Sequence, residues 1–317
     1  RRGGGVMGLA RDLSTLPADD RTADDGRTPD PTPRFVGVLA AAWAANIDDN
    51  KPTAHGTRIR HSDAGKCARA LAYTAADVPR SDPMDLTGAW NVTLGTKLHE
   101  AWQEALHAAY PDAEIEVKVR HDDLDASGHI DAVIRADGRT IAYELKTIGG
   151  YGYKAAVGKA RRGTPAEGPK TEHVLQAALN GVGVDADEIV VGYLAKECIS
   201  VNQATGLDEL GRFAAEWTFT RDEFEPLAAA EKARMNGVLA LLDEEGLLAA
   251  RKFPAGLLPA GAEIVDPAKG RWEARDSDGA IVDAGTWWAC GYCPYRTVCA
   301  STSAGRIPVG DVAVAVA

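Results

Sequence analysis

The stretch GHIDAVIRADGRTIAYELKT, residues 128–147, contains two alternating apolar and polar runs separated by Asp137-Gly138. An Asp-Gly pair in this position is typical of a β-hairpin closed by a two-residue type I′ turn, because both turn residues need positive φ angles. The turn fixes the register, since a slip of one residue would exchange the two faces of each strand. The sequence therefore predicts a hairpin with Asp137 and Gly138 at its tip.

The predicted register divides the hairpin into an apolar and a polar face. The apolar face is formed by the pairs Ile134–Ile141, Ala132–Tyr143 and Ile130–Leu145. On the polar face Asp131 lies opposite Glu144, and like charges placed ~5 Å apart in this way destabilise a sheet unless something neutralises them. A hard cation such as Mg²⁺ or Mn²⁺, which binds carboxylate oxygens, would do so.

Lys146 adds a positive charge to the same face, because side chains two residues apart in a strand point the same way. Two carboxylates, a divalent cation and an ammonium group are suited to hydrolysis of a phosphodiester. The metal polarises a phosphoryl oxygen and activates water, while Lys146 orients the nucleophile or offsets developing charge. The ordinary alternative is a solvent-facing strand with a Glu-Lys pair.

The rest of the chain alternates helical and strand patterns without internal repeats. We expect a mixed α/β fold with helices over 35–45, 65–74, 96–110, 171–182 and 221–245, and strands over 114–120, 188–195 and 214–220. Residues 1–33 are rich in Gly, Asp, Arg, Pro and Thr and should form a disordered leader. This leaves one domain over 34–301 and a C-terminal tail over 302–317.

The composition indicates the cellular compartment in which the protein functions. No apolar run reaches the ~18 residues of a membrane span, and no secretory signal is recognisable, so we expect a cytoplasmic protein without membrane contact. Five cysteines are an odd number for a disulfide framework, and their spacing suits a metal site in a reducing compartment.

The net charge of −11 is unfavourable for nucleic-acid binding as a whole, but the charge is unevenly distributed. Residues 151–170 contain five basic side chains against one acid, Glu167. We expect a mobile basic loop that contacts DNA, although such a run is also compatible with an ordinary solvated loop. Its candidate DNA-binding residues are Tyr151, Tyr153, Lys154, Lys159, Arg161 and Arg162, with the two tyrosines available to stack on unpaired bases.

Gly128-His-Ile-Asp131 followed by Tyr143-Glu144-Leu-Lys146-Thr147 resembles the core motif of the PD-(D/E)XK nucleases, and specifically their RecB-type branch. The resemblance implies a restriction-endonuclease-like core and metal-dependent cleavage of DNA. In this branch an upstream helix supplies a metal-binding histidine, and Gly95-Thr-Lys-Leu-His99-Glu100 is similar to that motif.

The resemblance also implies two further site residues. The backbone carbonyl of Leu145 would complete the metal site together with Asp131, Glu144 and His99. Gln176 matches a catalytic glutamine on the helix after the core. The family places a tyrosine four residues later, and here that position is Asn180.

Cys290-x2-Cys293-x5-Cys299 gives three thiols in one short segment, and Cys67 is a candidate fourth ligand. Four thiolates suit either an iron-sulfur cluster or tetrahedral zinc. The arrangement of one cysteine before the core and three after it resembles the cluster-bearing RecB-type nucleases, among them AddB and the small nucleases of CRISPR adaptation and of phages. That resemblance implies a 4Fe-4S cluster.

These features together lead us to expect a Mg²⁺- or Mn²⁺-dependent DNA exonuclease, acting on DNA ends or single strands in recombination, repair or phage DNA processing. The resemblance favours 5′→3′ polarity. Two alternatives stay open: a catalytically silent module that binds DNA ends beside a recombination or adaptation partner, and a zinc-stapled protein that is not a nuclease.

Overall fold

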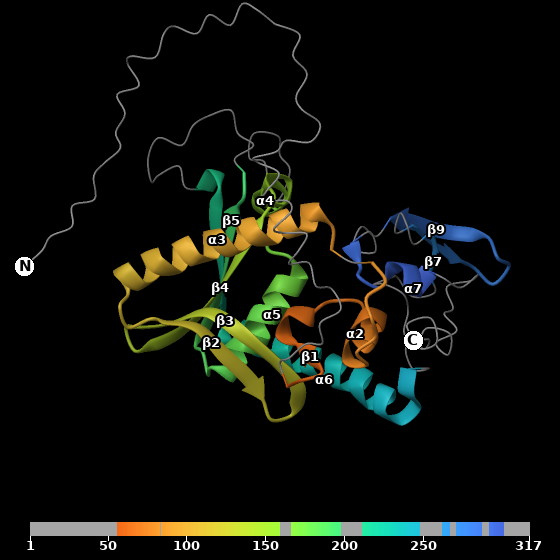
Figure 1. The fold of residues 1–317 in the computed structure, drawn as a ribbon, viewed down its shortest axis with the longest axis horizontal. Helices are drawn as coiled ribbons and strands as arrows, with labels where there is room; N and C mark the ends of the chain where they lie inside the picture. Colours follow the sequence, from red (N-terminus) through yellow and green to blue (C-terminus); the bar gives the residue numbers. More distant parts are fainter. Residues whose placement is uncertain are drawn as a thin grey trace, which may run out of the picture. The chain divides into compact units, whose positions relative to one another are not determined.

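The computed structural model describes residues 56–82, 84–158, 166–197, 211–247, 262–266, 271–286 and 292–300. The helix expected over 35–45, the expected leader and the expected tail lie outside these ranges. Within them the fold is mixed α/β, as predicted (Figure 1). No helix in the described ranges combines the length and the apolar character that a membrane span requires.

The central sheet is mixed and six-stranded. Its strands are β1 (Ile59–Arg60), β2 (Glu114–His121), β3 (Leu124–Ala136), β4 (Arg139–Ile148), β5 (Glu188–Ala195) and β6 (Ala214–Thr220). They are ordered β1-β3-β4-β5-β6, and β2 also pairs with β3. The pairs β1–β3 and β4–β5 are parallel, whereas β2–β3, β3–β4 and β5–β6 are antiparallel. The predicted hairpin, β3–β4, thus lies inside the sheet rather than at its edge.

The register predicted from the Asp-Gly turn is confirmed from the tip of the hairpin to Ala132–Tyr143, where the ladder between β3 and β4 ends. The predicted pairs Asp131–Glu144 and Ile130–Leu145 lie beyond that ladder. Ala132 pairs with Tyr143 and Ile134 pairs with Ile141. Asp137 and Gly138 have φ angles of 53° and 73°, as a type I′ turn requires.

The expected single apolar face of the hairpin is divided between two clusters. Ala132 and Tyr143 pack in a small cluster with Trp102, whereas Ile130 belongs to the larger core. The division occurs at Asp131, where the register of β2 places Glu116, a residue with a φ of 53°. We attribute the change of side to this local distortion of β2, which alternation alone does not reveal.

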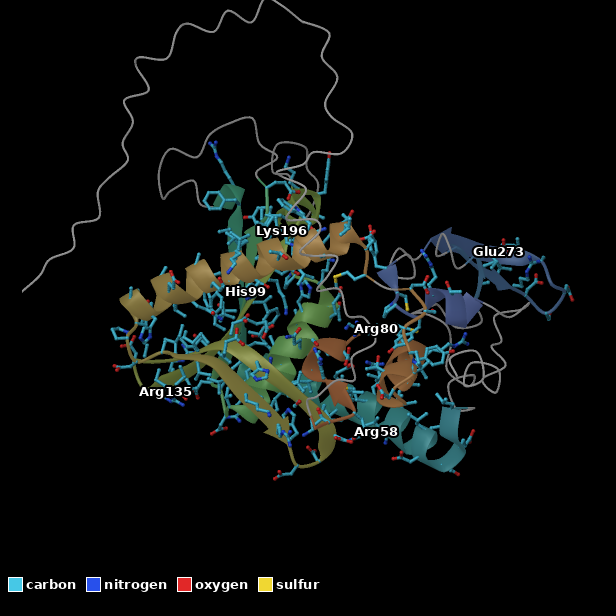
Figure 2. All side chains as sticks on the ribbon, viewed as in Figure 1. Arg58, Arg80, His99, Arg135, Lys196 and Glu273 are labelled. Atoms are coloured by element: carbon cyan, nitrogen blue, oxygen red, sulfur yellow. The ribbon has the colours of Figure 1, made fainter. Side chains whose placement is uncertain are left out.

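Helices cover both faces of the sheet. The described helices are the 3₁₀ turn η2 (His61–Asp63), α2 (Ala68–Ala75), α3 (Leu86–Ala109), α4 (Gly150–Val157), α5 (Thr171–Gly183), α6 (Arg221–Glu245) and α7 (Arg296–Ala300). Trp102 of α3 stacks on Tyr143 with ring centroids 4.8 Å apart. Lys196, after β5, donates to the Asn91 carbonyl of α3 at 2.7 Å, which ties the helix to the sheet (Figure 2).

The α5 helix packs on the other face of the sheet. Leu179 is fully buried there, and a Cβ at Gly181 would lie 2.4 Å from Ile189 Cγ2 of β5. The absence of a side chain at Gly181 lets α5 approach the strands closely, so that polar residues on its sheet-facing side can reach β4.

Three expectations need correction. The helix expected over 96–110 begins ten residues earlier, at Leu86, because Asp85 caps it by accepting the Gly88 N–H at 2.7 Å. Residues 150–157 form α4 rather than part of a loop. The region after α6, for which the sequence predicted no strand, contains a second sheet of β7 (Ala262–Asp266), β8 (Arg271–Arg275) and β9 (Ile281–Thr286).

Candidate active site

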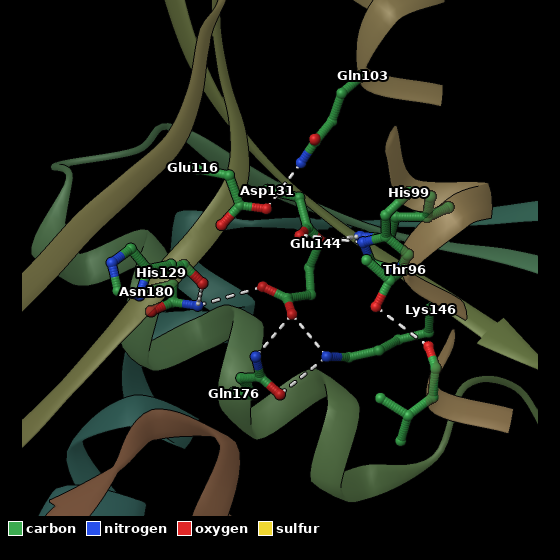
Figure 3. Close-up of polar contacts among 12 residues, drawn as sticks. Thr96, His99, Gln103, Glu116, His129, Asp131, Glu144, Lys146, Gln176 and Asn180 are labelled. Carbon is green, nitrogen blue, oxygen red and sulfur yellow. Dashed lines mark hydrogen bonds and ion pairs between the residues drawn. The ribbon is translucent and has the colours of Figure 1, made fainter. Parts of the chain in front are cut away.

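Polar side chains from four elements meet beside the β3–β4 hairpin (Figure 3). They are His99 of α3, Asp131 of β3, Glu144 and Lys146 of β4, and Gln176 and Asn180 of α5. Sequence reasoning assigned the first five to the site, and the structure brings all five together.

The Asp131 carboxylate is held by the backbone N–H of Leu145 on β4 and by the His99 side chain. Its carboxyl group is almost fully buried, and Oδ2 accepts the Leu145 N–H at 2.7 Å. Oδ1 lies 3.3 Å from His99 Nδ1. The N–H of Leu145 therefore fixes the carboxylate of Asp131, while the predicted role of the Leu145 carbonyl as a metal ligand stays a prediction.

Glu144 is the most enclosed charged group of the site, with 2% of its surface exposed. Its Oε1 accepts from Lys146 Nζ and from Gln176 Nε2, each at 2.6 Å, and its Oε2 accepts from Asn180 Nδ2 at 3.2 Å. Burial raises the pKa of Glu144 to about 7; Lys146 opposes this shift and the charge of Asp131 adds to it. The site thus holds a desolvated carboxyl group that titrates near neutral pH.

Lys146 and Gln176 complete a triangle with Glu144. The Lys146 ammonium donates to Gln176 Oε1 at 2.9 Å as well as to Glu144. Because the Gln176 amide nitrogen donates to Glu144, the orientation of that amide is determined by its partners. Gln176 therefore contacts two polar side chains of β4 and is not a fully solvent-exposed helix residue.

The donor set has the chemistry that a hard divalent cation prefers, with two carboxylates and an imidazole close together. The side chains are not closed around one point, and in the ranges that the structure describes no three His, Cys, Asp or Glu residues are arranged to hold a metal ion. The reason is visible in Figure 3, where the Glu144 carboxylate is directed toward Lys146 and α5 while Asp131 meets His99. Lys146 provides the counter-charge for Glu144 in this arrangement.

The predicted DNA-binding residues behave differently from one another. Tyr151 is 82% exposed on α4, as a base-stacking residue requires. The prediction for Tyr153 is wrong, because its ring is buried in the core and its hydroxyl donates to the Gly211 carbonyl at 2.8 Å. Lys154 is half-buried on α4, so it does not belong to a mobile loop. Lys159, Arg161 and Arg162 lie outside the described residues.

Two of the three C-terminal cysteines, Cys293 and Cys299, lie in described ranges and pack against the larger core. Burial raises the pKa of Cys293 to about 11, and the Cys67 and Cys299 thiols add to the shift. Among the described residues, these cysteines are not arranged to hold a metal ion. Arg69 Nη1 donates to Cys299 Sγ at 3.4 Å. Cys290, the remaining predicted ligand, lies outside the described residues.

The segment around α7 is tied to the α2 region by further contacts. Tyr295 packs against Tyr73 with ring centroids 5.3 Å apart, and Asp82 accepts the Thr297 N–H at 2.6 Å. These contacts join the segment that bears Cys299 to the segment that follows Cys67.

Sequence reasoning missed two residues of the site. Asn180 was noted only as a departure from a family pattern, although it follows Gln176 by four residues and so lies on the same helix face. His61 was not considered. It is fully buried, with Nδ1 2.7 Å from Asn180 Oδ1, and no local pattern relates residues so distant in the sequence.

No family model and no curated protein matches the chain. Among solved structures, a protein called SSO0001 is 18% identical with a TM-score of 0.41, over 66% of this chain and 88% of that one. An alkaline exonuclease from Laribacter hongkongensis is 15% identical with a TM-score of 0.36, over 51% and 73%. A phage-related exonuclease from Haemophilus somnus is 12% identical with a TM-score of 0.30, over 47% and 72%.

Proposed function

We propose that this protein is a divalent-metal-dependent DNA nuclease that hydrolyses phosphodiester bonds. The observation that supports this function best is the placement of Asp131, Glu144 and Lys146 on adjoining strands, with both carboxyl groups buried and the ammonium 2.6 Å from Glu144. Buried like charges are costly, and a site that keeps them beside a lysine is suited to binding a cation and a phosphate together.

Asp131, Glu144, His99 and the Leu145 carbonyl would hold the cation, Mg²⁺ or Mn²⁺. When bound, the cation supplies Lewis-acid activation of water and of the scissile phosphate. Once Glu144 binds the cation, the Lys146 ammonium would place a positive charge beside the reacting phosphate. Gln176 retains Lys146 through its Oε1, so the ammonium stays positioned when it leaves Glu144.

The finer assignment is an exonuclease that acts on DNA ends or single strands in recombination, repair or phage DNA processing, with 5′→3′ polarity. Tyr151 supports contact with unpaired bases, because it is exposed and follows the strand that bears Lys146 by three residues. Cleavage of linear but not circular DNA would establish the need for an end. Substrates blocked at the 5′ or the 3′ end would establish polarity.

The site assignment is tested by comparing Asp131→Asn and Lys146→Met with the wild type on single- and double-stranded DNA in Mg²⁺ or Mn²⁺. Asp125→Asn is a matched control, because Asp125 lies on the same strand but is exposed. We expect both site variants to lose at least about 100-fold in rate and the control to retain activity. Full activity in both site variants would refute the assigned site. DNA-end binding without cleavage by the wild type would favour a silent assembly module.

We also propose that Cys67, Cys290, Cys293 and Cys299 hold a 4Fe-4S cluster. The packing of Cys293 and Cys299 against the core that includes α2 supports it, as does the donation to Cys299 from Arg69, two residues after Cys67. Anaerobic purification should yield about four iron and four sulfide ions per chain. Cys299→Ser should lose them, whereas Cys198→Ser should not, because Cys198 is the one cysteine of the sequence outside the predicted set of ligands. Stoichiometric zinc without iron would instead establish a zinc staple.

A further inference from the structure

We propose that His61 is a positioning residue for Glu144 and acts through Asn180. The inference rests on the proposed nuclease function and extends it to a residue outside the predicted motifs. His61 belongs to the turn η2, which directly follows β1, and β1 pairs in parallel with β3. The sheet therefore fixes the backbone of His61 relative to the strand that bears Asp131.

The three residues form one chain of hydrogen bonds. His61 Nδ1 lies 2.7 Å from Asn180 Oδ1, and Asn180 Nδ2 lies 3.2 Å from Glu144 Oε2. Asn180 Nδ2 also donates to the His129 carbonyl at 3.0 Å (Figure 3). All three linked side chains are at most 2% exposed, so water does not compete with these bonds.

The partners determine where the protons are. Asn180 faces two acceptors, the His129 carbonyl and Glu144, so its NH₂ group must be on that side. Its Oδ1 therefore faces His61 and can only accept, which requires a hydrogen on His61 Nδ1. Burial lowers the pKa of His61 to about 4, so at neutral pH the imidazole is the neutral Nδ1–H tautomer, and it sets the rotation of the Asn180 amide.

The second ring nitrogen of His61 makes no hydrogen bond comparable to that of Nδ1. Its Nε2 is buried and, among the described residues, has no hydrogen-bond partner. A buried polar atom without a partner is unfavourable, so a histidine here is poorly explained as a core-filling residue. The bond to Asn180 is the interaction that requires a histidine at this position.

Gly128 provides the space for this arrangement. A Cβ at residue 128 would lie 2.5 Å from His61 Nδ1 and 2.7 Å from Asn180 Oδ1. The glycine that opens the hairpin motif therefore keeps the junction between His61 and Asn180 open.

The consequence concerns the direction of the Glu144 carboxylate. Lys146 and Gln176 both bind Oε1, and Asn180 is the side chain that binds Oε2. If the Asn180 amide loses the bond that fixes its rotation, Oε2 loses its directed donor. Glu144 would then bind a cation less well, while the surface that meets DNA would be unchanged.

The test compares His61→Leu, which lacks the donor, with His61→Asn, whose amide nitrogen takes the place of Nδ1. We expect His61→Leu to bind Mn²⁺ alone about 10- to 100-fold more weakly and to lose a similar factor in kcat, with little change in KM for DNA. His61→Asn should stay close to the wild type in both measurements. Thermal unfolding of each variant establishes that the compared proteins are folded.

Each outcome has a defined meaning. Equal impairment of His61→Leu and His61→Asn, or wild-type behaviour of both, would overturn the positioning role. Asp131→Asn separates the two hypotheses: if it is fully active, the proposed nuclease site fails, whereas an inactive Asp131→Asn beside a fully active His61→Leu rejects only the role of His61. Should His61→Leu not fold, nitrogen NMR of the wild-type histidines decides, because protonation of His61 at Nε2 rather than Nδ1 contradicts the inferred tautomer.

Discussion

Replacing Glu144 by glutamine should reduce the loss of stability that the metal-free protein undergoes as the pH rises to neutral, although it should abolish activity. Glu144 is 2% exposed, and burial raises its pKa from 4.5 to about 7. A carboxyl group with a raised folded-state pKa binds its proton more tightly in the folded chain than in the unfolded chain. Its ionisation therefore reduces stability as the pH rises from 4.5 to about 7, and the full cost remains at higher pH.

The size of the effect follows from the shift in pKa. Each unit corresponds to about 1.4 kcal/mol, so the difference between 4.5 and about 7 corresponds to about 3 kcal/mol. Glutamine has a similar shape and no titrating proton. We compare the free energies of unfolding of Glu144→Gln and of the wild type at each pH. The value for the variant minus the value for the wild type should increase by about 2 to 3 kcal/mol between about pH 5 and about pH 8.

Urea unfolding in the presence of EDTA measures this difference at each pH. Glu104→Gln is the matched control, since Glu104 is exposed on α3 and its replacement should have a small effect at every pH. Adding Mn²⁺ should then stabilise the wild type more than Glu144→Gln, because only the wild type keeps the second carboxylate. A difference that is constant with pH, or that decreases as the pH rises, would refute the reasoning about Glu144.

Three further predictions concern other parts of the molecule. Gly192→Ala should destabilise the fold by about 1 to 3 kcal/mol, measured by chemical unfolding, because its Cβ would lie 2.1 Å from the hydroxyl oxygen of Tyr143. Asp82→Ala should remove the acceptor of the Thr297 N–H at 2.6 Å and increase the rate at which thiol reagents modify the C-terminal cysteines. Tyr151→Ala should weaken single-stranded DNA binding by about 1 to 3 kcal/mol in a fluorescence titration.

Each of these three predictions has a matched control variant. A Cβ at Gly237 meets nothing within 4 Å, so Gly237→Ala should be neutral or stabilising. Thr297→Val keeps the backbone donor that Asp82 accepts from and should alter thiol reactivity less than Asp82→Ala. Tyr292 is as exposed as Tyr151, at 82%, and Tyr292→Ala should leave DNA affinity unchanged. The opposite ranking within any pair would contradict the corresponding prediction.

The parts of the site that the sequence predicts are those governed by local rules. The Asp-Gly turn determines the register of β3 and β4, and alternation then places Glu144 and Lys146 on one face. The bounds of β5, β6 and α6 agree with expectation because each has a clear periodic pattern. The division of the hairpin's apolar face was not predictable, since it depends on the positive φ of Glu116 on a neighbouring strand.

The parts that the sequence could not predict depend on contacts between distant segments. His61 and Asn180 are separated by 119 residues, and only the packing of α5 near η2 brings them together. Tyr153 shows the converse error: its place in a basic segment suggested exposure, whereas helix formation turns its ring into the core. Composition describes a segment as a whole and does not distinguish the inward from the outward side of a helix.

The contacts of α7 with the α2 region also determine when the fold can be completed. Asp82 and Thr297 are 215 residues apart, and at translation rates of about 5 to 20 residues per second Thr297 is added roughly 10 to 40 seconds after Asp82. During that interval the hairpin and the central strands can already pair, while Tyr73 lacks its ring contact with Tyr295. A nascent chain would thus present this apolar surface to chaperones and proteases until α7 has left the ribosome.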